Sequence, residues 1–369
     1  MNEYVTGLIL LKAMNQAAVR EDRTDRISYY ANILNPIFNT SIFNTTDSLF
    51  EIVCTLVRAS GIQDAGWDPW GESREAMDDL FNLAMLELPP EKFPRAERTN
   101  LRLALLSYCH VTEMDFPYVL VANLLNLRTG KKYKMNPFDH LTRPQKKKGG
   151  LFPKLMPPSP GRKILFIKEL AKEAKLPLVG QAFEEIYDND VRNAVYHSDY
   201  TLTDKEFRIR SGTRLSRTKK HFTPVVPLDE LSDIISNAFA FYSALFALYD
   251  RCLKSFGDFI DAFLPYDFHY KGVLQLLFDT DNSLIGFRVY WPNGTIGEYK
   301  RTKQGCSGIN FQFDPDGSVN FFVGLYPAKH GNFSLLVEEG AKPHYVNVPG
   351  ANVAPHWPGD LKPYKLNLN

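Results

Sequence analysis

The sequence has few cysteines, no long apolar run and none of the common catalytic or nucleotide-binding motifs. Its four cysteines are far apart in 369 residues and form no CxxC pair, so we expect buried free thiols in a reducing cytoplasm, without a disulfide framework or a metal site. They are Cys54, Cys109, Cys252 and Cys306. The motifs HExxH, GxxxxGK[ST] and GxSxG are absent, which argues against a zinc protease, a P-loop nucleotidase and a serine hydrolase. No cofactor is expected.

Two further absences concern the membrane. No apolar run approaches about 18 residues, the length that a membrane-spanning helix needs. Residues 1–12 lack a basic segment followed by a cleavage site, so no signal peptide is expected. With 44% hydrophobic and 23% charged residues, the composition is typical of a soluble globular protein. We therefore predict a cytoplasmic protein of two or three domains with no membrane contact.

Acidic residues are scarce in two segments near the middle of the chain. Residues 128–163 contain 11 basic residues and one acidic residue, and residues 201–221 contain seven basic and two acidic residues. Residues 1–126 have the opposite excess, with 17 acidic and 10 basic residues. Each basic segment alone is typical of solvated loop charge, but the pair also fits contact with a polyanion such as RNA. The candidate RNA-binding residues are Lys146, Lys147, Lys148, Arg208, Arg210, Lys219 and Lys220.

Apolar residues recur at spacings of three and four in the first two-thirds of the chain, which is typical of helices. The predicted helices cover residues 4–20, 47–60, 74–87, 98–127, 162–175, 178–198 and 228–256. Thr46 or Asp47 is expected to cap the second of these helices, and Gly61 to end it. Phe116-Pro117 is expected to divide 98–127 into two helices, because proline removes an N–H. Six prolines in residues 136–161 predict an extended basic loop.

Short strands and turn residues replace this helical pattern after about residue 266. A hairpin is predicted earlier, over 200–209, with its turn at Asp204-Lys205. The C-terminal strands are predicted at 273–278, 284–291, 295–299, 309–313, 319–325 and 334–337. In the second of these, Phe287, Val289 and Trp291 share one face, which we expect to be core. The C-terminal tail has five prolines from Pro343 to Pro363 and is expected to be irregular.

Together these patterns predict a mainly α-helical bundle with a C-terminal antiparallel β domain, α+β overall. Residues 1–45 would form an N-terminal helical extension. Residues 46–260 would form a helical domain that carries the basic proline-rich loop 136–161. Residues 265–369 would form the β-rich domain, and the sequence does not indicate its role.

The most informative segment is Arg192-Asn193-Ala194-Val195-Tyr196-His197-Ser198-Asp199-Tyr200. Arginine can hold a phosphate, and histidine can transfer a proton near neutral pH. On a helix 178–198, an apolar and a polar stripe lie about 200° apart. The apolar stripe is Phe183, Tyr187, Val191 and Val195, and the polar stripe is Glu185, Asn189, Asn193 and His197. Arg192 lies about 140° from His197, so the two can share a site only through the length of the arginine or through a second subunit.

The segment resembles the Arg-x4-His signature of HEPN (higher eukaryotes and prokaryotes nucleotide-binding) domains, in which a polar residue often follows the arginine, as Asn193 does here. The resemblance extends to roughly residues 46–258 and leaves the C-terminal strands unexplained. It implies a metal-independent endoribonuclease in which two copies of the motif helix face each other across a homodimer. His197 would act as the acid or base, Arg192 as the phosphate clamp and Asn193 as an orienting residue.

The resemblance further implies a product with a 2′,3′-cyclic phosphate and a 5′-hydroxyl. Many HEPN ribonucleases are toxins or antiviral defence effectors, so control by an antitoxin or a trigger protein is expected. Two other hypotheses stay open. One is a non-catalytic RNA-binding or scaffolding protein that keeps the fold and the phosphate contact. The other is a protein-interaction module in which Arg192 and His197 are ordinary surface residues.

Overall fold

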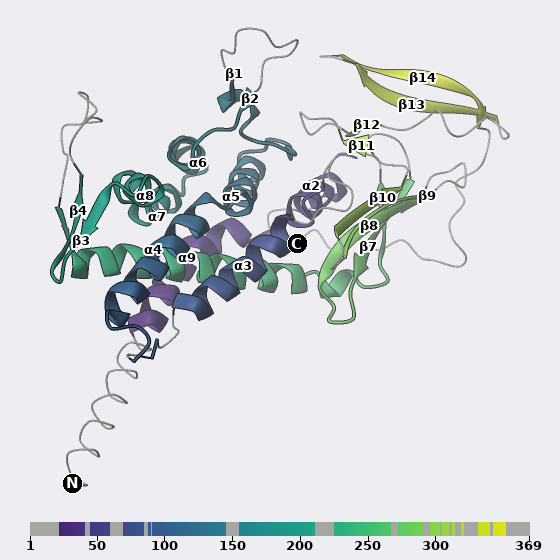
Figure 1. Cartoon of the computed structure of the whole chain (residues 1–369). Coiled ribbons are helices and arrows are strands. Elements are labelled where there is room, and N and C mark those ends of the chain that lie inside the picture. The colour runs from purple at the N-terminus through teal and green to yellow at the C-terminus, as the bar shows by residue number, and fades with distance from the viewer. Residues whose placement is uncertain are drawn as a thin grey trace.

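The computed structural model shows helices and antiparallel sheets, an α+β architecture as the sequence predicts (Figure 1). It describes residues 22–40, 45–59, 69–84, 88–89, 91–144, 155–210, 225–266, 272–290, 296–302 and 305–309. It also describes the shorter stretches 312–313, 319–320, 331–339 and 342–351. The predicted helix at 4–20, the segment Lys146–Lys148 and the pair Lys219 and Lys220 lie outside these residues.

Helices form most of the described part up to residue 259. Residues 22–34 are helical. The elements that follow are η1 (Asn35–Phe38), α2 (Thr46–Leu56), α3 (Pro69–Ala84), α4 (Ala96–Glu113), α5 (Asp115–Arg128), η4 (Asp139–Leu141), α6 (Pro160–Glu173), α7 (Pro177–Glu185), α8 (Asn189–Tyr196), α9 (Leu228–Lys254) and η5 (Gly257–Phe259).

Helix α9 is the long central helix of the helical part, and the other helices pack beside it (Figure 1). Its Phe241 is fully buried and makes edge-to-face contacts with Tyr30 at 5.5 Å and Phe183 at 4.7 Å between ring centroids. By length and composition, Leu228–Phe259 is sufficient to cross a membrane, contrary to the expectation from the apolar runs. However, 61% of its most apolar window is buried inside the protein, as expected for a core helix.

The predicted ends of α2 are wrong. The N-cap is Thr45, whose hydroxyl accepts from the Ser48 N–H at 3.2 Å, while the Ser48 hydroxyl accepts from the Thr45 N–H. This reciprocal pair is a capping box. The helix ends at Leu56, before Gly61 is reached, because Arg58 takes the left-handed conformation with φ 47°. Residues far away in the sequence, described below, hold this end of α2, so the local sequence does not predict it.

The predicted break in 98–127 is confirmed, although it lies at Met114 between α4 and α5. Pro117 stands in the first turn of α5, where a missing N–H costs no helical hydrogen bond. The break therefore precedes the proline by three residues.

The predicted helix 178–198 is two helices, α7 and α8, and this corrects the sequence analysis. The chain leaves the helix after Glu185 and starts again at Asn189. Asp188 is the new N-cap: its carboxylate accepts from the N–H groups of Asp190 at 2.7 Å and Val191 at 2.8 Å. The Asp188 N–H in turn donates to the Tyr108 hydroxyl at 2.8 Å. A partner on α4 thus stabilises the break.

The predicted hairpin after α8 is confirmed and has a third strand that the sequence analysis missed. Strand β3 (Tyr200–Leu202) pairs with β4 (Glu206–Ile209), and β4 pairs with β5 (Val225–Pro227), both antiparallel. Tyr200 stacks on Phe207, with ring centroids 4.8 Å apart. This small sheet and the start of α9 lie at one end of the helical part (Figure 1).

A five-stranded antiparallel sheet lies at the other end of α9, beside α2 (Figure 1). Its order is β10-β9-β8-β7-β6. The strands are β6 (Phe263–Tyr266), β7 (Gly272–Phe278), β8 (Leu284–Tyr290), β9 (Ile296–Thr302) and β10 (Gly305–Ile309). Phe287 and Val289 are fully buried, as predicted, while Trp291 lies outside the described residues.

The sheet and the helices share one buried cluster. Phe287 packs edge to face against Phe50 of α2, with centroids 5.0 Å apart. The Tyr299 hydroxyl donates to the Arg58 carbonyl at 3.0 Å, and Arg301 donates to the Val57 carbonyl at 3.2 Å. The end of α2 is therefore held by β9.

Several further strands depart from the predictions. Residues 342–351 form β14 (Lys342–Ala351), which pairs with β13 (Gly331–Glu339), so the expectation of an irregular tail is wrong there. Among the described strands β14 has one unpaired edge, which tolerates its prolines. Within the predicted loop 136–161, β1 (Arg143–Pro144) pairs with β2 (Leu155–Met156). The remaining strands are β11 (Gln312–Phe313) and β12 (Val319–Asn320).

Candidate functional site

Helix α8 carries the Arg-x4-His segment, and its own amphipathicity decides how it packs. Val191, Ala194 and Val195 are buried against the helical core. Asn193 and His197 are on the other side, where Asn193 is half-buried and His197 is exposed. The two stripes predicted from the sequence therefore hold within α8, even though the turn at 186–188 separates them from α7.

The end of α8 has a strained residue beside His197. His197 is the C-cap, and Ser198 after it has φ 53°. The Ser198 N–H donates to the Val195 carbonyl at 3.1 Å, and the Asp199 N–H donates to the Ala194 carbonyl at 2.9 Å. This pair of bonds is a Schellman motif, in which glycine usually takes the left-handed position. A serine there costs free energy and holds the chain at a fixed turn directly after His197.

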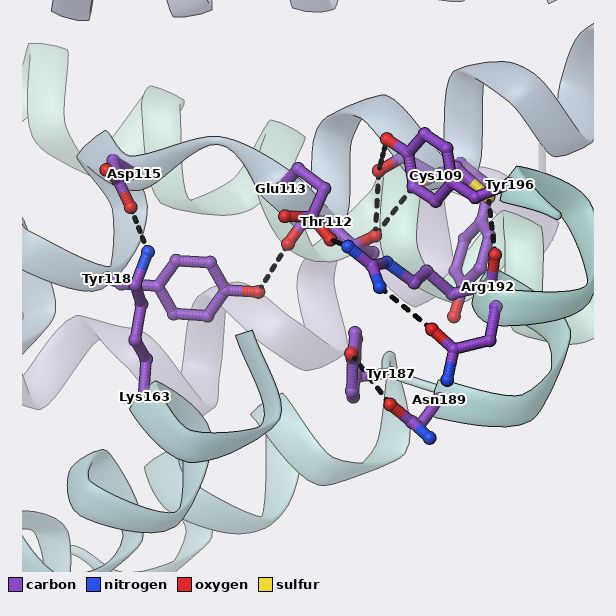
Figure 2. A network of polar contacts seen from close by, with 12 residues as sticks. Cys109, Thr112, Glu113, Asp115, Tyr118, Lys163, Tyr187, Asn189, Arg192 and Tyr196 are labelled. Atoms are coloured by element: carbon purple, nitrogen blue, oxygen red, sulfur yellow. Dashed lines mark hydrogen bonds and ion pairs between the residues drawn. The ribbon is translucent and has the colours of Figure 1, made fainter. Parts of the chain in front are cut away.

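Arg192 contacts three side chains, and Figure 2 labels two of them, Glu113 and Tyr196. Its guanidinium forms an ion pair with Glu113 at the end of α4, and its Nη1 donates to Asn193 Oδ1 at 2.8 Å. The guanidinium carbon also lies 4.7 Å from the centroid of the Tyr196 ring, a cation–π geometry. The Arg192 side chain is 23% exposed, so the cation is fixed yet open on one side. Its Nε is buried with no hydrogen-bond partner among the described residues.

Helix α4 lies directly under Arg192 and Tyr196. Cys109 Sγ is 3.9 Å from the Arg192 carbonyl oxygen, and the Tyr196 hydroxyl donates to the Cys109 carbonyl at 3.4 Å. Burial raises the pKa of the Cys109 thiol to about 12, despite the opposing effect of Arg192. The thiol is therefore neutral at physiological pH and packs as a small apolar group. Cys54 and Cys252 are likewise buried and free, as predicted.

The break between α4 and α5 places two carboxylates on either side of Met114. Glu113 binds Arg192 of α8, while Asp115 binds Lys163 of α6. The Lys163 side chain is only 7% exposed. Tyr118 closes the same junction, because its hydroxyl donates to the Thr112 carbonyl at 2.7 Å. Figure 2 shows these contacts as a row from Lys163 to Arg192. The junction between α4 and α5 therefore forms ion pairs with both α6 and α8.

The predicted site residues are only partly brought together. Arg192 and Asn193 are bonded to each other. The His197 imidazole is exposed, and it makes no hydrogen bond or ion pair with any described residue, Arg192 included. Arg208 pairs with Glu206 and is 59% exposed, and Arg210, also exposed, donates its backbone N–H to the Asp199 carbonyl at 2.8 Å.

The sequence analysis missed Glu113 and the role of Tyr196. Glu113 is far from Arg192 in the sequence, and no local motif links the two. Tyr196 lies inside the motif, but its contact with the guanidinium depends on the helix position of both residues.

A hollow of about 440 Å³ lies at the other end of α4, lined by Phe93–Arg98 and Asp204. Arg98 pairs there with Asp204, at the turn between β3 and β4. The hollow includes neither Arg192 nor His197, and its charges largely cancel. We therefore locate the candidate site at the α4–α8 contact, where the fixed cation and the exposed histidine occur.

No protein-family model, curated protein or solved structure matches this chain. In the described part of the chain, no group of three or more histidine, cysteine, aspartate or glutamate residues has a metal-binding arrangement. Function is therefore argued from the Arg192 contacts and the surface around them.

Proposed function

We propose that this protein is a metal-independent endoribonuclease with a HEPN-like helical domain, acting in the cytoplasm as a toxin or antiviral defence effector. The observation that carries the proposal is the arrangement on α8: Arg192 is fixed but open on one side, and His197 is exposed at the end of the same helix. A fixed cation and an exposed imidazole on one helix suit the cleavage of a phosphodiester.

In the proposed reaction, His197 accepts the proton of an RNA 2′-hydroxyl as that oxygen attacks the adjacent phosphorus. The bond from phosphorus to the 5′-oxygen breaks and the 5′-oxygen takes up a proton, which leaves a 2′,3′-cyclic phosphate and a 5′-hydroxyl. Arg192 stabilises the negative charge that grows on the phosphoryl oxygens. Asn193, which accepts a hydrogen bond from Arg192, keeps the guanidinium oriented.

The surface around Arg192 supports the proposed pairing of two copies through α8. Two large apolar side chains are exposed there: Leu106 of α4 is 56% exposed and Tyr196 of α8 is 50% exposed. The Tyr196 hydroxyl reaches α4 at Cys109, so α4 and α8 form one continuous face. A homodimer through this face would bury both side chains and bring a second Arg192 and His197 near the first.

Basic residues near this face are the proposed RNA contacts. Arg208 and Arg210 lie on or directly after β4, in the sheet that follows His197, and both are exposed. We extend the proposed contact surface to Lys146–Lys148 and to Lys219 and Lys220, which lie outside the described residues. An antitoxin or trigger protein is the proposed regulator.

A second candidate is a non-catalytic RNA-binding or interaction scaffold. The observation in its favour is that Glu113 already occupies the Arg192 guanidinium. A phosphate must displace this carboxylate or share the guanidinium with it before the arginine can act. The two candidates differ in one measurable property, which is cleavage at bound RNA.

The deciding test uses the His197→Ala variant and total cellular RNA. We expect wild-type protein to cut RNA without added metal and in the presence of a chelator, and the variant to bind RNA with similar affinity without cutting it. His140→Ala is the matched control, because His140 is also exposed but packs on Phe166, with ring centroids 4.5 Å apart. Wild-type protein that binds RNA and never cuts it would support the scaffold. A strictly monomeric mass in solution would contradict the proposed dimer.

A further inference from the structure

The proposed reaction needs two proton transfers, and one imidazole is poorly placed for both. The attacking 2′-oxygen and the leaving 5′-oxygen lie on opposite sides of the phosphorus in an in-line displacement. A group that removes the proton on one side cannot at the same moment donate a proton on the other. A second proton-transfer residue is therefore expected across the phosphate from His197.

His110 lies on α4, in the same turn as the Glu113 that binds Arg192. It is exposed in the last turn of α4, three residues before Glu113. Side chains at this spacing are neighbours on a helix surface, with Cβ atoms about 5–6 Å apart. Glu113 binds the Arg192 guanidinium, so His110 is separated from the proposed phosphate clamp by a single side chain.

The Tyr196 hydroxyl links the helix positions next to the two histidines. Tyr196 directly precedes His197, and its hydroxyl bonds to the carbonyl of Cys109, which directly precedes His110. The tyrosine ring therefore spans the distance between the two helix positions. Arg192 packs on this ring, and Figure 2 shows Glu113, Arg192, Tyr196 and Cys109 together.

We propose that His110 donates the proton to the leaving 5′-oxygen, so that one chain carries both proton-transfer residues. This inference rests on the proposed function. As the new bond from the 2′-oxygen to phosphorus forms and the bond to the 5′-oxygen breaks, the 2′-hydroxyl proton passes to His197 and a proton passes from His110 to the 5′-oxygen. Exchange with solvent then returns both imidazoles to their starting forms.

The test compares two RNA substrates that differ at one atom. One has the natural 5′-oxygen at the cleavage position, and the other has a bridging 5′-sulfur. A thiol has a pKa of about 8.5, so a thiolate leaves without a proton donor. We expect His110→Gln to slow cleavage of the oxygen substrate by about 100-fold and to cleave the sulfur substrate at nearly the wild-type rate. His197→Gln should be slow on both substrates, because the 2′-hydroxyl proton must be removed in each.

His140→Gln is the control and should match wild type on both substrates. Thermal unfolding of each variant checks that the exposed substitutions leave the fold intact. Equal slowing of both substrates by His110→Gln would overturn the inference, since the residue would then not assist the leaving group. Wild-type rates for this variant would also overturn it and would assign the second proton transfer to another residue or to the second subunit. Failure of the wild-type protein to cut either substrate would instead refute the proposed ribonuclease activity itself.

Discussion

Two of the arginine–glutamate pairs in the described part of the protein link separate elements and have different surroundings. Arg192 and Glu113 join two helices, and Arg288 and Glu298 join neighbouring strands of the five-stranded sheet. Arg288 also reaches Gln275, and Lys300 reaches Glu298, so the sheet pair belongs to a cross-strand polar ladder. Ladders of this kind stabilise a sheet by modest amounts.

The helix pair lies in a different environment. Arg192 has a buried Nε without a described partner and an aromatic ring against its face. An exposed histidine and a left-handed serine follow on the same helix. An arginine–glutamate ion pair alone therefore says little about function. The proposed reaction rests on the partly exposed guanidinium, the exposed imidazole on the same helix and the strained backbone after it.

The largest expected difference between the two pairs is in catalysis. Arg192→Lys keeps the charge but loses the planar fork that matches a phosphate, so we expect RNA cleavage to fall by about 100-fold or more. Arg288→Lys is the matched control and should leave the rate unchanged. Initial rates on one labelled RNA measure both effects. Equal losses in the two variants would indicate that Arg192 has no special role and would remove the distinction drawn above.

The next effect concerns the competition between Glu113 and phosphate. In a His197→Ala background, which binds without cutting, Glu113→Gln should tighten RNA binding about tenfold, or ~1.4 kcal/mol, because the guanidinium is freed and a negative charge is removed. Glu298→Gln in the same background should leave the affinity unchanged. Fluorescence titration at fixed salt gives both dissociation constants. Weaker binding by the Glu113 variant would show that the carboxylate orients Arg192 for the phosphate and does not compete with it.

How much of the site was predictable depends on the range of each interaction. The exposed and buried faces of α8 follow from residues three or four apart, so the sequence predicts them correctly. The start of α8 does not follow in the same way, because the Asp188 cap is stabilised by Tyr108 from another helix. The Arg192–Glu113 pair is also long-range, and neither residue type alone indicates the other.

The same distinction explains the errors in the fold. Glycine is the usual residue at the end of a helix, and this rule suggested Gly61 as the end of α2. In the structure, Arg58, Lys175 and Ser198 occupy left-handed positions after α2, α6 and α8. The end of α2 is held by Tyr299 and Arg301 from β9. Tertiary contacts thus select helix ends that local residue preferences do not show.

A smaller effect tests the strain at the end of α8. Ser198→Gly removes the steric cost of the left-handed position, and after the extra freedom of glycine in the unfolded chain is subtracted we expect a gain of about 0.5 kcal/mol. Ser198→Ala keeps the Cβ atom and should give no gain. Lys175→Gly, at the equivalent position after α6, should match Ser198→Gly. Urea unfolding measures all three. A loss of stability in Ser198→Gly would mean that the serine is not strained.

The smallest expected effect belongs to the sheet pair and depends on pH. Burial alone would raise the pKa of Glu298, but hydrogen bonds from Arg288 and Lys300 lower it below its ordinary value of 4.5. A carboxylate with a lowered pKa stabilises the fold above the unfolded value, and this contribution is lost as pH falls through the folded value.

At pH 7 we therefore expect Glu298→Gln to cost about 0.5 kcal/mol, and the difference from wild type to shrink as the pH falls below 4.5. Urea unfolding midpoints across this range measure the effect. In an Arg288→Gln background, the pH dependence of the difference should weaken, because the main hydrogen-bond donor is gone. A difference that grows on acidification would contradict the lowered pKa. The sheet pair would then no longer be the simple structural counterpart of Arg192 and Glu113.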